Sequence, residues 1–208
     1  SLSKNISLAR FANVAFSDGS LLHGFRNRIE KFQPLSAPKD IKRYFITPKE
    51  SGELCMMSAI LGENNDLFFP KLREELHAIS FSELAIRYLQ SQGYEPYECD
   101  SEDEAKFRSH DLIKQKKWPC YFFESDTTGE KHLEEFFTDE ERLDMNKYLN
   151  IGVIKLENIT DTEKLDNFRS TINKIKVKNK WSKEELVNLF LETLPDFNHE
   201  EKNKNLDE

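Results

Sequence analysis

The chain has 208 residues, of which 38% are hydrophobic and 33% charged, and its formal net charge is −8. This length suits one core with an appendage or two small domains, and no apolar run approaches the roughly eighteen residues of a membrane-spanning helix. The cysteines, Cys55, Cys99 and Cys120, lie far apart and form no C-x-x-C pair. This spacing argues against a disulfide framework or a structural zinc site and favours the reducing cytoplasm.

The charges are unevenly distributed along the chain. Between Arg10 and Lys49 there are 8 basic and 3 acidic residues, whereas Glu95 to Asp144 holds 16 acidic and 7 basic residues. A basic stretch in an acidic protein suits an anionic small molecule better than nucleic acid, which requires a larger basic surface. A solvated face with scattered lysines explains the same pattern equally well. We expect neither a nucleic-acid nor a membrane partner.

The first third of the chain predicts a strand, a helix and an extended edge. Residues 6–16 ("ISLARFANVAF") are β-branched and apolar, as in a strand buried on both faces. Residues 20–32 ("SLLHGFRNRIEKF") have apolar side chains at helical spacing, and a glycine-serine turn precedes them. Residues 33–38 ("QPLSAP") are too short and proline-bounded to be more than an extended edge.

Capping signals mark the later helices. Thr47 with Pro48 and Glu50 forms a capping box, and the apolar face of the helix that follows is expected to consist of Leu54, Met57, Ile60 and Leu61. Further capped helices are predicted from Ser80, ended by Gly93, from Thr138 and from Ser182. Short strands are predicted at 66–70, 94–99 and 119–125. The pattern is α/β followed by α+β, with residues 1–154 as one domain and 155–208 as a helical extension with a polar tail.

Four stretches in order carry a resemblance to one family: "ARFANV" (9–14), "SDGSLLHGF" (17–25), "KRYFIT" (42–47) and "TTGEKHLEEFF" (127–137). Together they resemble the C-terminal half of extended short-chain dehydrogenases/reductases, and most of all the nucleotide-sugar 4,6-dehydratases of polysaccharide biosynthesis that act on UDP-N-acetylglucosamine. The resemblance covers about Ile6 to Ile154. "WSKEELVNLFLETLPDFNH" (181–199) also resembles the C-terminal end of one bacterial subgroup.

The resemblance implies an α/β fold with the last strands of a Rossmann-type parallel sheet and a smaller α+β substrate-binding lobe. In that family the N-terminal half binds NAD or NADP and carries a glycine-rich turn and a Tyr-x-x-x-Lys pair. This sequence has neither motif, because none of its six tyrosines is followed four residues later by lysine. The NAD(P)-binding half is therefore expected to be missing, and no catalytic residue is assigned.

The resemblance also implies a set of binding residues. Asn13 would contact the sugar or diphosphate, Gly19 and Ser20 would present a helix N-terminus to the diphosphate, and the backbone at Leu35 would pair with the uracil. Arg43 would grip the nucleotide phosphates, as a guanidinium does by bidentate contact, and Glu130 would contact the ribose hydroxyls. Phe11 and Ala12 would pass close to the nicotinamide.

Each assignment has a structural alternative. These are an amide that ties down a strand end (Asn13), an ordinary helix start (Gly19, Ser20), a packed leucine (Leu35), a surface arginine (Arg43) and a solvated acidic helix around Glu130. Relatives commonly read Arg-Pro-Gly-Glu-Lys where this chain has Thr127, Thr128, Gly129, Glu130 and Lys131, so a second phosphate clamp is in doubt. The five histidines show no metal-ligand spacing.

The functional expectation is an NAD(P)-dependent 4,6-dehydratase, homo-oligomeric when full-length and inactive as this chain alone. A UDP-sugar C4 epimerase or reductase of the same family is one alternative. The other is a non-catalytic module that binds nucleotide sugars or another protein.

Overall fold

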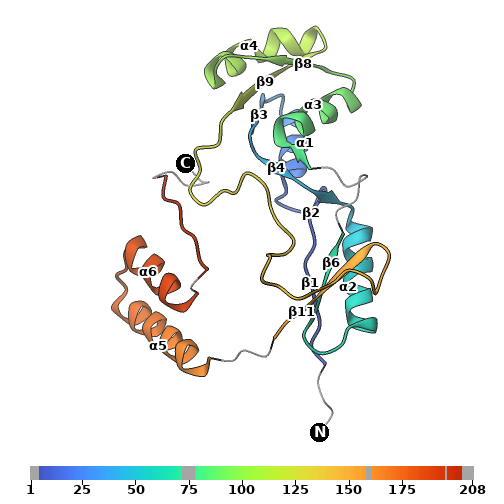
Figure 1. The fold of residues 1–208 in the computed structure, drawn as a ribbon. Helices are drawn as coiled ribbons and strands as arrows, with labels where there is room; N and C mark the ends of the chain where they lie inside the picture. The colour runs from blue at the N-terminus through green and yellow to red at the C-terminus, as the bar shows by residue number, and fades with distance from the viewer. Residues whose placement is uncertain (1–4, 72–77, 158–160, 195, 203–208) are drawn as a thin grey trace. The chain divides into compact units, whose positions relative to one another are not determined.

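The computed structural model of the protein describes residues 5–71, 78–157, 161–194 and 196–202. The chain divides into two compact units: Ser1–Ser125 with Lys131–Leu156, and Asp126–Glu130 with Glu157–Glu208. Helices and parallel strand pairs are mixed in the first unit, and the second is helical (Figure 1). The first unit is therefore mixed α/β, the fold class expected from the sequence.

The largest sheet of the first unit has the strand order β1-β6-β11-β10. Its strands are β1 (Leu8–Ala9), β6 (Asp66–Pro70), β11 (Ile151–Lys155) and β10 (Leu143–Asp144). β1 is parallel to β6, whereas β11 is antiparallel to both β6 and β10. A side chain at Gly152 would collide with the ring of Phe69, which explains a glycine in this fully packed strand.

A three-stranded parallel sheet has the order β3-β9-β8. Its strands are β3 (Leu35–Pro38), β9 (Lys117–Phe123) and β8 (Glu95–Glu98). Two pairs complete the unit: β2 (Asn13–Val14) with β5 (Phe45–Ile46) in parallel, and β4 (Lys42–Arg43) with β7 (Ile79–Ser80) in antiparallel orientation. The predicted edge at residues 33–38 is confirmed, because β3 is the outer strand of its sheet.

Four helices cover these strands in the described part of the unit: α1 (Leu21–Glu30), α2 (Pro48–Leu61), α3 (Phe81–Ser91) and α4 (Glu102–Lys114). Three start at the predicted caps, whereas α4, capped by Ser101, was not predicted from the sequence. Ser20, Thr47 and Ser80 cap α1, α2 and α3, and the reciprocal bonds of the Thr47–Glu50 capping box are formed. α2 packs on β1 and β6, α1 and α3 on β3, and α4 on β9.

Each main sheet carries its own apolar core. One core joins α1, α3, β3 and β9 through residues that include Phe25, Leu35 and Trp118. Around the four-stranded sheet, a second core includes Ala12, Ile46 and Phe69, and a third joins Leu54 of α2 to Phe68 and Val153. These buried side chains supply most of the stabilisation, because burial of a large apolar side chain contributes about 1.5–3 kcal/mol.

The second unit contains two helices that contact each other, α5 (Thr162–Lys178) and α6 (Lys183–Thr193). Asp161 caps α5, and Ser182 caps α6 as predicted. The ring of Phe168 lies 5.5 Å from that of Phe190. Glu201 accepts a hydrogen bond from Thr128, which links the C-terminal segment to residues 126–130.

The expected single strand over residues 6–16 is wrong. The residues form two short strands that pair with different partners, β1 with β6 and β2 with β5. The change of partner breaks the ladder between Arg10 and Ala12. β1 is an edge strand, and this leaves Leu8 partly exposed, so the segment is not buried on both faces.

The expected apolar face of α2 is only partly correct. Leu54 and Ser58 are its buried residues, one helical turn apart, and Ile60 and Leu61 are exposed. Ile60 lies far around the helix from the line of Leu54 and Ser58, and Leu61 is the last helical residue. The helix therefore keeps a second, exposed apolar side that includes Met56.

The helix predicted from Thr138 is absent. The Glu141 carboxylate does accept the Thr138 N–H, as in a helix cap, but the chain makes only a turn there. The residues that follow pair with β11 as strand β10. This pairing with β11, which is itself paired with β6, overrides the local helical signal. Residues 131–137, for which a solvated helix was the alternative, are also not helical.

Candidate functional site

The turn between β2 and α1 is the first part of the candidate site. The Asn13 N–H donates to the Tyr44 carbonyl at 3.0 Å, and Asn13 pairs with Phe45 in the parallel ladder. The residue is exposed, not buried as the sequence suggested. Its amide side chain is therefore available to a ligand at the edge of the β2–β5 pair.

The start of α1 is a well-formed helix N-terminus. Gly19 has a φ of +73°, a conformation that favours glycine, and Ser20 is the N-cap. Ser20 Oγ accepts the His23 N–H at 3.3 Å, so one of the first N–H groups is already bonded. The first N–H groups of a helix have no partner within it and attract anions. The exposed Asp18 carboxylate, 3.3 Å from His23 Nδ1, lies at the same end and opposes a phosphate there.

Arg43 lies in a buried polar setting instead of on the surface, which excludes the surface alternative. Its side chain is only 8% exposed, and Nε lies 3.4 Å from a carboxylate oxygen of Glu134. Nη1 donates to the carbonyls of Lys42 at 2.9 Å and Lys131 at 2.8 Å. The guanidinium also stands over the Phe81 ring, 5.7 Å from its centre. Arg43 thus holds residues 131–134 beside β4.

The other expected residues differ in how deeply they are buried and in the unit to which they belong. Leu35 is fully buried in the core between α1, α3 and β9, so its side chain is a packed leucine, while its backbone lies in an edge strand. Ala12 is buried and Phe11 is 43% exposed just after β1. Glu130 belongs to the second unit, and it is not free of interactions within the protein.

The first unit therefore brings several expected residues into one region. β2 and β5 join Asn13 to Phe45, two residues after Arg43, and α1 follows β2 directly. Phe81 of α3 contacts both Phe45 and Arg43. The region combines an exposed amide, a helix N-terminus and a fixed guanidinium, which are groups that bind phosphate and sugar oxygens.

A hollow of about 650 Å³ at the carboxyl end of β6 was not found from the sequence. It is lined by the first turns of α2, by Pro70 and Lys71, and by Tyr148–Ile151. The Lys71 ammonium contacts the carbonyls of Met145 and Tyr148. Ligands of open α/β sheets bind beyond the carboxyl ends of the strands. No sequence motif marks this hollow, because its walls come from three distant segments.

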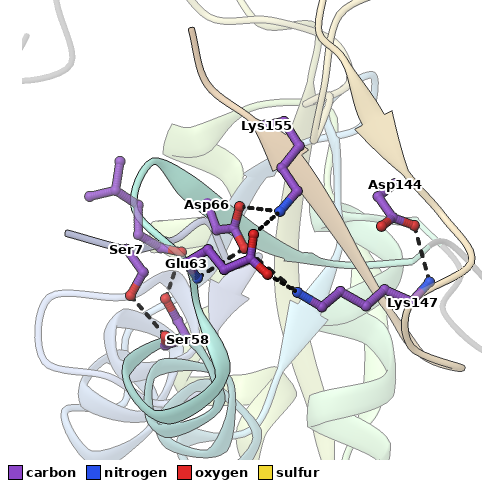
Figure 2. A network of polar contacts seen from close by, with 8 residues as sticks. Ser7, Ser58, Glu63, Asp66, Asp144, Lys147 and Lys155 are labelled. Atoms are coloured by element: carbon purple, nitrogen blue, oxygen red, sulfur yellow. Dashed lines mark hydrogen bonds and ion pairs between the residues drawn. The ribbon is translucent and has the colours of Figure 1, made fainter. Parts of the chain in front are cut away.

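A network of ion pairs around one buried carboxylate lies near the opposite, amino end of β6 (Figure 2). Asp66 is fully buried, and Lys155 Nζ lies 2.7 Å from its Oδ1 and 3.2 Å from Glu63 Oε2. Lys147 Nζ lies 3.5 Å from Glu63 Oε1. A hydrogen bond from Lys155 and the charges of Lys147 and Lys155 lower the pKa of Glu63, and a hydrogen bond to the Asp66 carboxylate raises the pKa of Lys155. The network fastens β11 and the β10–β11 connection to β6.

Two of the three cysteines are buried, whereas Cys55 is exposed. Burial raises the pKa of the Cys120 thiol to about 12, and burial also raises the pKa of Cys99. Both therefore remain protonated at neutral pH and react slowly. Within the described ranges, no group of three or more histidine, cysteine or acidic side chains is placed to hold a metal ion. None of the described helices has the length and apolarity needed to cross a bilayer.

Comparison with known proteins identifies the fold and the family. A solved structure, that of Pen from Bacillus thuringiensis, aligns with 91% of this chain at 19% identity and a TM-score of 0.53. The chain spans half of the length of Pen, so the likeness concerns the fold alone. No curated protein matches. The family model for polysaccharide biosynthesis proteins matches residues 1–156, which include every expected site residue, and the chain therefore belongs to that family.

Proposed function

We propose that this chain is the substrate-binding part of an NAD(P)-dependent nucleotide-sugar 4,6-dehydratase that acts on a UDP-N-acetylglucosamine-type substrate. The observation that carries the proposal is the family match over residues 1–156. Within those residues lies the region of Asn13, the α1 N-terminus and Arg43, and these groups suit an anionic, hydroxyl-rich ligand. The similarity in fold to Pen, over half of that chain, is consistent with the proposal.

The unpaired edge of β1 supports a sheet that continues in the parent protein. β1 runs parallel to β6, and within the described chain no strand pairs with its outer side. Ile6 and Leu8 are exposed beside it, as are Met56 and Ile60 on the neighbouring helix α2. A Rossmann-type sheet whose remaining strands bind NAD(P) would cover such an edge.

We assign one part of this chain to the proposed cofactor. In nucleotide-sugar 4,6-dehydratases, NAD(P) accepts a hydride from the sugar and later returns it. The exposed Phe11 ring, which follows β1 and precedes the small buried Ala12, offers an apolar face to a planar ring. We assign these two residues to the nicotinamide side of the site.

The surroundings of Arg43 refine its proposed role. The Arg43 guanidinium is already bound by the carbonyls of Lys42 and Lys131 and by the Glu134 carboxylate. Arg43 therefore positions residues 131–134 before any ligand binds. A phosphate reaches it only when the 59%-exposed Glu134 carboxylate moves aside. We infer that Glu134 competes with the phosphates for Arg43.

Titration with UDP tests this proposal on the chain itself. We expect a Kd of about 1 mM or weaker, or about −4 kcal/mol, because half of the cleft lies in the other lobe. Glu134→Gln should tighten binding by removing the competing carboxylate, whereas Glu135→Gln, on the exposed neighbouring residue, should not. Arg43→Lys should weaken binding, with Arg28→Lys on exposed α1 as control. Micromolar binding by a monodisperse monomer, unchanged by the Arg43 substitution, would show that the site is elsewhere.

A C4 epimerase or reductase of the same family remains the alternative activity, because residues that bind the nucleotide do not fix the outcome at C4. Analysis of the product formed by the full-length enzyme separates these reactions. The non-catalytic module has no observation in its favour among the contacts described above.

A further inference from the structure

The end of α5 and the turn after it form a basic and partly apolar surface. From Asn173 to Ser182 the sequence contains four lysines and no acidic residue. All four lysines are exposed, and Val177 and Trp181 are 87% and 67% exposed. We call this surface the basic tip; it consists of Lys174, Lys176, Val177, Lys178, Lys180 and Trp181.

Helical geometry explains how the tip is arranged. Ile175 is the buried residue of α5. At about 100° per residue, Val177 lies on the opposite side of the helix from Ile175, and Lys176 and Lys178 lie to either side of Val177. Asn179 ends the helix in the left-handed conformation, with a φ of 51°. Lys180 and Trp181 therefore lie in the connection between α5 and α6.

The four lysines are not used inside the protein. Among the described residues, none of them forms an ion pair, in contrast to Lys183, whose ammonium lies 2.5 Å from the Glu201 carboxylate. The acidic groups nearest in sequence are Glu184 and Glu185 in the first turn of α6. Lysines near the C-terminal end of a helix interact favourably with its dipole. The helix dipole explains why Lys176 and Lys178 stand at the end of α5. It does not explain why the apolar side chains of Val177 and Trp181 are exposed among the lysines.

We propose that the basic tip docks the protein peripherally onto an anionic lipid bilayer. The lysine ammonium groups complement anionic head groups while their alkyl stems lie along apolar surface. Tryptophan is suited to the boundary between lipid and water because its ring is apolar and its N–H is polar. Val177 also gains by leaving water for the acyl boundary.

Two other anionic partners fit the tip less well. Nucleic acid is bound mainly through larger basic surfaces, often with arginine, and residues 173–183 contain none. The carboxylates of an acidic protein would form ion pairs with the lysines. They would not explain why Val177 is exposed among these lysines. The net charge of −8 does not prevent docking, because charges more than about 8 Å apart are largely screened at physiological ionic strength. The proposal departs from our sequence-based expectation of no membrane partner.

Vesicle flotation of the full chain tests the proposal. The probes are phosphatidylcholine vesicles with and without about 30% phosphatidylserine, at low and high salt. We expect binding only to the anionic vesicles and its loss at high salt. Removal of one lysine should weaken partitioning about fivefold, so Lys176→Gln/Lys178→Gln should weaken it about 25-fold. The matched control is Lys31→Gln/Lys114→Gln, which removes two charges at the ends of α1 and α4.

Tryptophan fluorescence gives a second readout. The chain has two tryptophans, and Trp118 is fully buried, so a blue shift with anionic vesicles reports on Trp181. The shift should disappear in Trp181→Phe. Absence of binding to anionic vesicles at low salt would overturn the proposal. So would equal binding by the double-lysine variant and its control, or binding of a single-stranded oligonucleotide in place of the vesicles.

Discussion

At the scale of single residues, Arg43 was expected to bind ligand, and its side chain also stabilises the fold. The family resemblance implied an arginine that grips phosphates, and the structure places Arg43 against two carbonyls, Glu134 and the Phe81 ring. A basic residue in a short strand gives no sign of the segment, 88 residues later, that its side chain will bind. Gly19 and Ser20, by contrast, lie at the helix start that their sequence indicates, whereas Asn13 is the first residue of the short strand β2 and does not end a buried strand.

Arg43→Met should destabilise the first unit. The substitution leaves the Lys42 and Lys131 carbonyls without their donor, and hydrogen bonds to charged groups contribute about 1.5–3 kcal/mol. The exposed neighbour supplies the control, since Lys42→Met should change the free energy of unfolding by at most about 0.5 kcal/mol. Urea denaturation of both variants measures the difference. Equal midpoints would show that the buried guanidinium contributes nothing to the fold.

Lys155→Met should be among the most damaging single substitutions at the amino end of β6. It leaves the fully buried Asp66 carboxylate without its closest cation, which is 2.7 Å away. Because the Lys155 side chain is 30% exposed, the loss should be about 1.5–3 kcal/mol, as for a hydrogen bond to a charged group. Lys147→Met should cost much less, since that ammonium lies 3.9 Å from Asp66. Chemical denaturation of the two variants compares them, and a larger loss for Lys147→Met would contradict the assignment.

At the scale of elements, local signals predicted helix starts well and long-range pairing poorly. Ser20, Thr47, Ser80 and Ser182 each begin a helix, because a cap depends on residues within one turn. Thr138 carries the same signal but is followed by strand β10, whose partner β11 lies further along the chain. The strand expected over residues 6–16 is divided for the same reason. The hollow beside β6 depends on three such segments and has no local signal.

Two carboxylates that contact the β10–β11 connection, Glu63 and Asp144, should make the stability depend on acid pH. Hydrogen bonds and nearby lysines lower the pKa values of Glu63 and Asp144 below their ordinary values of 4.5 and 3.8. Carboxylates with a lowered folded pKa stabilise the fold above their unfolded pKa, and this contribution is lost as pH falls through the folded pKa. The melting temperature should therefore fall as the pH drops below about 4.5.

Substitution isolates the source of this acid dependence. Glu63→Gln/Asp144→Asn should lower the melting temperature at neutral pH and flatten its decline in acid. Lys155 affects stability at alkaline pH. Its raised pKa in the folded state adds stability that is lost as the pH rises above 10.5, the ordinary pKa of lysine. Circular dichroism melts across both ranges measure these effects. An unchanged acid decline in the double variant would show that other carboxylates dominate.

At the scale of the whole molecule, the exposed apolar surface beside β1 indicates association. The outer edge of β1 is unpaired within the described chain, and Met56 and Ile60 of α2 are 62% and 73% exposed. An unpaired edge next to apolar side chains invites contact with another chain. We expect this chain alone to sediment as dimers or larger species at micromolar concentration.

Charge substitution tests which surface causes the association. Met56→Glu/Ile60→Glu should shift the chain toward monomer in analytical ultracentrifugation. Phe107→Glu, on the 89%-exposed side chain of α4, is the control for an exposed apolar residue elsewhere and should leave the distribution unchanged. A monomeric wild-type chain would contradict the prediction, as would an equal response to the two changes.

The central claim concerns the reaction of the parent enzyme, and NMR analysis of its product tests that claim most directly. The proposal is tested on a protein that carries this chain together with an NAD(P)-binding half, incubated with NAD(P) and UDP-N-acetylglucosamine, with the sugar product examined at C4 and C6. A 4,6-dehydratase replaces the 6-hydroxymethyl group by a methyl group and leaves a carbonyl at C4. We predict that methyl signal. Recovery of an intact 6-hydroxymethyl group, with or without inversion at C4, would contradict the account.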